Sequence, residues 1–197
     1  MRTLILCLAL LGCNDTNTPD PDDEQEVITT VVLTFTPSEG GDPVVARWAD
    51  PEQDGDPAID DIELVLGTDY SLDVEFLDEA STPAEDITEE VKEEGDEHQV
   101  FITGNAIAGP ATLATADVPL THAYDDTDGN GNPIGLENSI EATEAGSGVV
   151  TITLRHLPEQ DGTPIKTADL ASEVASSGFG TLPGDNDVQV SFNATVQ

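Results

Sequence analysis

The chain has few basic, cysteine and aromatic residues. Among its 197 residues, Asp and Glu number 41 but Lys and Arg only 5, and the formal net charge is −36. So acidic a surface repels nucleic acid and anionic lipid headgroups and attracts cations. We therefore expect no nucleic-acid partner. Adaptation to a saline exterior accounts for most of this charge, since salt screens the repulsion between like charges.

Both cysteines, Cys7 and Cys13, lie near the start of the chain. The remainder therefore has no disulfide and no thiolate metal ligand. Arg2 precedes an apolar run, 4–11, that is far shorter than the ~20 residues of a membrane-spanning helix. This pattern is typical of a secretory signal. Its ending at Cys13 resembles the lipobox of bacterial lipoproteins, in which the cysteine becomes the lipidated first residue.

We expect three segments along the chain. Residues 1–12 are the predicted lipoprotein signal peptide, 13–26 an acidic flexible tether, and 27–197 a single domain. With Cys13 lipidated, the lipid anchor is the protein's only contact with the membrane. The predicted location is the outer membrane, on its periplasmic or cell-surface face.

Apolar and polar residues alternate over most of the domain, as they do in half-buried strands. Turn residues such as Gly and Asp separate the alternating segments. The pattern predicts an all-β fold, an antiparallel β-sandwich of the Ig-like, Greek-key type with about eight strands. The expected strands cover 27–36, 43–49, 59–66, 69–76, 98–103, 120–124, 148–156 and 187–197.

One short helix is predicted near 83–94. Thr82 is its expected N-cap, Pro83 takes the tolerated first position, and Glu85 completes a capping box. A second helical turn is expected over 167–176. The helices are too few for an α/β protein.

The strongest local motif runs from Asp126 to Glu137 and has the spacing of an EF-hand calcium loop. Asp126, Asp128 and Asn130 would supply side-chain oxygens, Asn132 a backbone carbonyl, and Glu137 the closing carboxylate. The flanking segments do not resemble paired helices, so Ca²⁺ would act here as a structural clip. The alternative is an Asp/Asn/Gly turn without an ion.

A second acidic loop, 50–56, has Asp60 and Asp61 beyond it. It could hold another cation, although its spacing matches no known template.

The three histidines share strand phase with apolar residues. They are therefore core-edge residues satisfied by hydrogen bonds, or else ligands of a transition metal. Imidazole with carboxylate suits Zn²⁺, Cu²⁺ or Fe. The candidate ligands of this site are His98, His156, Glu93, Glu94 and Glu97.

Catalytic motifs are lacking. The sequence has neither the G-x-S-x-G elbow nor S-x-x-K, and its one tryptophan and two tyrosines are few for a sugar cleft. We therefore predict that the protein is not an enzyme. A secreted hydrolase with a carboxylate pair is the weakest alternative.

Four segments, 26–31, 87–99, 124–136 and 154–158, resemble small lipoproteins of aquatic Gram-negative bacteria that carry the label "type 1 periplasmic binding fold". The resemblance covers most of 26–197. The label implies a two-lobed α/β protein, whereas the strand pattern predicts a sandwich. A link of this family to TonB-dependent outer-membrane receptors implies capture of a nutrient or metal ion for a transporter.

The leading hypothesis is therefore an outer-membrane lipoprotein that binds a metal ion or small ligand and assists uptake by an outer-membrane receptor. The alternative is a calcium-stabilised structural or adhesive module of the cell surface.

Overall fold

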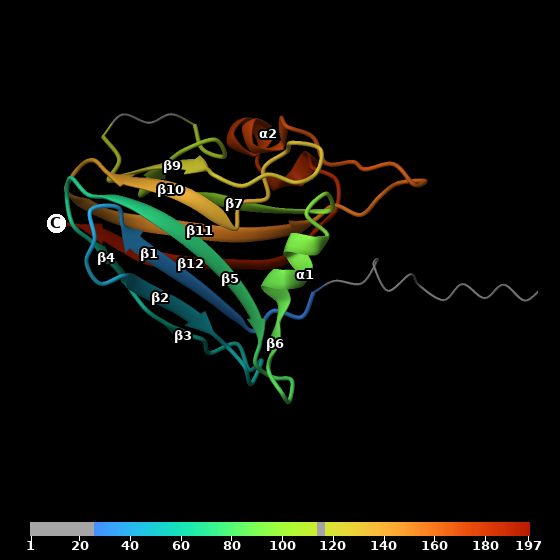
Figure 1. Ribbon diagram of the computed structural model, residues 1–197, viewed down its shortest axis with the longest axis horizontal. Coiled ribbons are helices and arrows are strands. Elements are labelled where there is room, and N and C mark those ends of the chain that lie inside the picture. The colour runs from blue at the N-terminus through green and yellow to red at the C-terminus, as the bar shows by residue number, and fades with distance from the viewer. Residues whose placement is uncertain (1–25, 114–116) are drawn as a thin grey trace, which may run out of the picture.

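The computed structural model describes residues 26–113 and 117–197, which form two packed, curled β-sheets (Figure 1). The predicted all-β sandwich is confirmed. The predicted signal peptide and nearly all of the predicted tether lie outside the described residues. Within the described part, no helix is long and apolar enough to cross a membrane.

The larger sheet has the order β3-β2-β1-β5-β10-β9-β8, with β6 also paired to β5. Its strands are β1 (Thr30–Pro37), β2 (Val44–Ala49), β3 (Ala58–Ile59), β5 (Asp69–Asp78), β6 (Glu85–Asp86), β8 (Ile107–Ala108), β9 (Leu120–Tyr124) and β10 (Glu137–Ala142). The smaller sheet has the order β4-β12-β11-β7. Its strands are β4 (Ile62–Leu64), β7 (His98–Gly104), β11 (Gly146–His156) and β12 (Asp185–Val196).

Most strand pairs are antiparallel, as predicted, but β12 pairs with β4 and β8 with β9 in parallel. The described residues form twelve strands rather than about eight, because several are only two or three residues long. The expected strand over 59–66 is divided between β3 and β4, which belong to different sheets. Strand β10 is absent from the predicted strands, because its sequence ENSIEA is mostly polar and has a buried Asn138 where alternation would show an apolar residue.

Strand β5 shows how alternation builds the core. Its Tyr70, Leu72, Val74 and Phe76 are at most 3% exposed and share one apolar cluster with side chains of the smaller sheet. Each buried side chain of this kind contributes about 1.5–3 kcal/mol relative to an exposed one. The register of β5 is therefore fixed, because a slip by one residue would expose all four.

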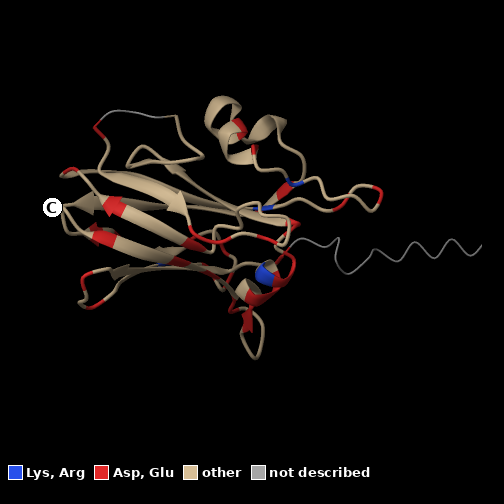
Figure 2. Ribbon diagram, turned by 45° about the horizontal axis from the view of Figure 1, so that its top comes forward, with Lys and Arg blue, Asp and Glu red and all other residues tan. Residues whose placement is uncertain are grey.

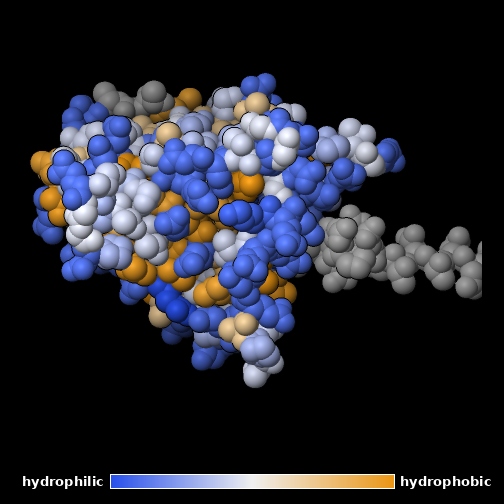
Figure 3. All heavy atoms as spheres, in the orientation of Figure 1, coloured by the Kyte–Doolittle hydropathy of each residue, from blue (hydrophilic) through white to orange (hydrophobic). Residues whose placement is uncertain are grey.

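The outer face of β5 carries acidic residues opposite other acidic residues. Asp73 lies opposite Glu137, and Asp69 opposite Glu141, on the neighbouring strand β10. Acidic segments are spread over the strands and around the helix α1 (Ile87–Glu93), with few basic ones between them (Figure 2). The face seen in Figure 3 is accordingly mostly hydrophilic. Like charges directly opposite one another destabilise a sheet, and salt screens this repulsion.

Helix α1 begins later than predicted. Glu85 and Asp86 form strand β6 against β5, so the backbone is still extended where the capping box was expected. The N-cap is Asp86, whose carboxylate accepts a hydrogen bond from the Thr88 amide, in place of Thr82. The second predicted helical turn is present as α2 (Leu170–Ser177), followed by the 3₁₀ turn η2 (Phe179–Thr181).

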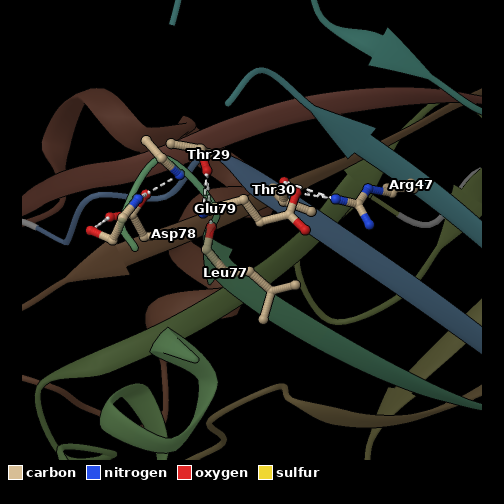
Figure 4. A network of polar contacts seen from close by, with 8 residues as sticks. Thr29, Thr30, Arg47, Leu77, Asp78 and Glu79 are labelled. Atoms are coloured by element: carbon tan, nitrogen blue, oxygen red, sulfur yellow. Dashed lines mark hydrogen bonds and ion pairs between the residues drawn. The ribbon is translucent and has the colours of Figure 1, made fainter. Parts of the chain in front are cut away.

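A polar network joins the start of β1 to the end of β5 (Figure 4). The Thr29 hydroxyl accepts a hydrogen bond from the Glu79 amide, and the Glu79 carboxylate accepts from the Thr30 hydroxyl and from Arg47. Together with the buried Asp78, which accepts from Ser81, the network closes this end of the sandwich.

Candidate metal centre

The two histidines predicted as metal ligands lie side by side. His98 begins β7, His156 ends β11, and the two are direct partners across the strands. Their rings are stacked, with centroids 4.7 Å apart and planes inclined by 9°. Both are buried on the inner face of the smaller sheet, in phase with Val100 and Leu154.

Stacking prevents this pair from holding one ion together. A metal bound to imidazole lies close to the plane of the ring, along the nitrogen lone pair. The planes of His98 and His156 are almost parallel, so no single ion can lie in both. The two histidines therefore do not form one site in this arrangement, and each lies near carboxylates of its own.

His98 forms the better candidate site, together with Glu94 and Glu26. One ligand atom from each of the three residues lies within 4.8 Å of the other two. His98 Nδ1 lies 3.9 Å from Glu94 Oε2 and 3.3 Å from the Glu94 carbonyl oxygen. Three elements supply the group, because Glu26 precedes β1, Glu94 is the C-cap of α1 and His98 opens β7.

The other predicted ligands take different places. Glu97 Oε2 lies 3.8 Å from His156 Nε2, so this pair forms a second, smaller group. Glu93, the last residue of α1, is exposed and does not join the three-residue group.

Two carboxylates near His98 were not among the predicted ligands. Glu26 was assigned to the tether, and Asp187 was only the first residue of a predicted strand. The Asp187 side chain is fully buried, and its Oδ2 lies 3.9 Å from His98 Nε2. No sequence signal places either residue beside a histidine that is so far away in the chain.

Burial dominates the electrostatics of this cluster. It raises the pKa of Asp187 to about 7, and the nearby Glu26 and Asp187 backbone groups offset only part of this effect. The pKa of Glu26 is also raised to about 7, first by burial and then by the charges of Glu90, Asp187 and Glu94. Burial and the adjacent His156 lower the pKa of His98 to about 4, so His98 is a neutral imidazole at pH 7, the form that binds metals.

A buried lysine contacts the predicted calcium loop. Lys166 Nζ lies 3.2 Å from Asp128 Oδ2, and both side chains are almost fully buried. The ammonium group also donates to the Gly95 carbonyl at 2.5 Å and the His98 carbonyl at 2.8 Å. Asp128 Oδ1 accepts from the amides of Asn130 and Asn132.

Two other predicted calcium ligands have partners of their own. The Asp126 carboxylate accepts from the amides of Gly135, Leu136 and Glu137. The Glu137 carboxylate lies 3.8 Å from Lys92 Nζ on the surface. These contacts are those of an Asp/Asn/Gly turn, and a calcium clip in this loop stays a prediction.

Two further candidates have structural roles. The third histidine, His122, is buried, and its Nε2 lies 2.9 Å from the Asn138 side-chain oxygen. In the second acidic loop, the Asp50 carboxylate accepts hydrogen bonds from the amides of Asp54 and Gly55 and so forms a turn.

Neither models of known protein families nor curated proteins and solved structures match this chain. Functional conclusions therefore rest on its own residues.

Proposed function

We propose that this protein is a lipid-anchored outer-membrane domain that binds one divalent transition-metal ion and assists its uptake by an outer-membrane receptor. The proposed ligands are Glu26, Glu94 and His98. Cys13 is the proposed lipid attachment site, and no enzymatic activity is proposed.

One observation carries the metal site: a neutral, fully buried imidazole next to two partly exposed carboxylates from separate segments. Imidazole and carboxylate together suit Zn²⁺ and neighbouring transition ions. Donor atoms around a tetrahedral Zn²⁺ ion are about 3.3 Å apart, given bonds of about 2.0–2.1 Å. The group here spans up to 4.8 Å. Binding therefore requires the glutamate side chains to move inward, while the buried imidazole stays in place.

The acidic surface supports the same proposal. A net charge of −36 concentrates cations near the protein and speeds their arrival. Such attraction is not selective, however, so selectivity for a transition ion has to come from His98.

Zinc titration of the full chain by calorimetry tests the proposal. We expect one strong site in the wild type and a loss of affinity of about tenfold or more, or 1.4 kcal/mol, in Glu26→Gln. The matched control is Glu90→Gln, which removes the same charge from an exposed position on α1 near Glu26. It should retain nearly the full affinity.

Absence of a strong site in the wild type would refute the proposal. Equal losses in the two variants would reduce the site to general electrostatic attraction. Calcium titration of the same samples measures whether the protein binds Ca²⁺.

A further inference from the structure

Asp187 occupies an irregular position in β12. Leu154 pairs with Val188 but the next residue, Arg155, pairs with Asn186, so Asp187 is an extra residue in a β-bulge. Val188 lies in the core, and regular alternation would place Asp187 on the opposite face. Instead its side chain is fully buried beside His98. Bulges re-aim side chains in this way and are frequent next to functional sites.

The local sequence holds this bulge in place. The Arg155 guanidinium donates to the carbonyl oxygens of Leu182, Pro183 and Gly184 and to the Asn186 side chain. Gly184 has a φ of +75°, and a Cβ there would collide with the His156 carbonyl oxygen. Both features fix the chain immediately before Asp187.

The bulge leaves Asp187 in an unfavourable position. Among the described residues, neither carboxylate oxygen of Asp187 has a hydrogen-bond partner of ordinary geometry, and neither does His98 Nε2. A buried carboxylate without well-formed hydrogen bonds destabilises a fold, and such positions usually have a functional reason. His98 Nε2 lies 3.9 Å from Asp187 Oδ2.

The two nitrogens of His98 face different acceptors. Nδ1 lies near Glu94, whose carbonyl oxygen holds a proton on Nδ1 when no metal is bound. A metal ion on Nδ1 requires the proton to be on Nε2 instead, and Nε2 faces Asp187. Histidine ligands commonly donate their second N–H to a carboxylate, which orients the ring and strengthens the metal bond.

We propose that Asp187 is the positioning residue of His98, a proposal that rests on the proposed metal site. Asp187 accepts a hydrogen bond from the Nε2–H of His98 and thereby selects the tautomer whose Nδ1 binds the metal. Asp187 itself does not bind the ion. In the metal-free fold Asp187 is buried without this hydrogen bond, and it gains the bond when the metal binds to Nδ1 of His98.

Asp187→Asn separates this role from a structural one, because stability and affinity should change in opposite directions. In EDTA, the full-length variant should melt at or above the temperature of the wild type, since a buried unpaired carboxylate is removed. Its zinc affinity should fall about 10- to 100-fold. Asp185→Asn removes an exposed charge that acts on Asp187 from the same strand; it is the control and should change both quantities much less.

A second measurement identifies the nitrogen. The ¹⁵N chemical shifts of the zinc-loaded wild type should show His98 with Nδ1 bound to metal and Nε2 protonated. Metal on Nε2, unchanged affinity in Asp187→Asn, or a loss of affinity in parallel with a lower melting temperature would each overturn the role of Asp187 while leaving the metal site standing. A wild type without zinc binding would overturn both.

Discussion

Lys166 offers the sharpest test of the fold around the candidate site. Its ammonium group is buried between the end of α1, the start of β7 and the loop that contains Asp128. Lys166→Met keeps most of the side-chain volume but removes the charge and three polar contacts. The Asp128 carboxylate, 1% exposed, is then left without its counter-charge.

Breaking a buried ion pair in this way typically costs about 3–5 kcal/mol. For a domain of this size, each kcal/mol corresponds to roughly 2–4 °C in melting temperature. We therefore expect Lys166→Met to melt roughly 6–20 °C below the wild type. Urea denaturation at pH 7 would give the same difference as a free energy of unfolding.

Two controls make the measurement decisive. Lys92→Met removes an equal charge from an exposed pair with Glu137, whose atoms are 3.8 Å apart, and should cost at most about 1 kcal/mol. Adding Asp128→Asn to Lys166→Met should recover much of the loss, since no unpaired charge then remains. The reasoning fails if Lys166→Met costs no more than Lys92→Met, or if the double variant is no more stable than the single one.

Two further predictions concern the bulge region. For metal-free Asp187→Asn, we expect greater stability than the wild type at pH 8, by on the order of 2–4 kcal/mol, because burial raises the pKa of Asp187 in the folded state from its ordinary value of 3.8 to about 7. As the pH falls from 7 towards 4, Asp187 takes up a proton and the wild type gains stability, so the difference in free energy of unfolding between variant and wild type should shrink. Urea denaturation across pH 4–8 measures this difference. A difference that stays constant would contradict the role of the Asp187 charge. Gly184→Ala should lower the free energy of unfolding by at least about 2 kcal/mol more than Gly178→Ala, because both glycines have positive φ but only the Cβ at Gly184 meets backbone. Thermal unfolding of the pair checks this, and similar losses in both would count against the close approach to His156.

Strand positions in the sandwich were predictable wherever apolar residues alternate with polar ones and the apolar residues are the buried ones. In β5 and β12, apolar residues every second position coincide with the buried ones. The signal failed for β10, whose buried Asn138 is polar, and for α1, whose start depends on the pairing of β6 with β5. Pairing with a distant strand leaves no trace in the local sequence.

The candidate site was predictable only in part. Strand phase identified His98 and His156 as inward residues, and Glu94 and Glu97 lie close to them as expected. Asp187 was missed because a bulge reverses the face that alternation assigns. The loop from Asp126 to Glu137 has calcium spacing, but its cation comes from Lys166, a distant residue that the motif cannot include.

The place of β12 in the smaller sheet bears on the order of folding. This strand lies between β4 and β11, although β4 is far earlier in the sequence. Strands β7 and β11 pair with each other directly, but β4 joins them only through β12. The smaller sheet therefore cannot be completed until residues 185–196 have been synthesised, and it covers the apolar face of the larger sheet only in part until then. Such long-range pairing makes folding slow and leaves the incomplete chain open to chaperones. The strand that completes the sandwich also brings Asp187 to His98, so the contact proposed to orient His98 forms only in the finished fold.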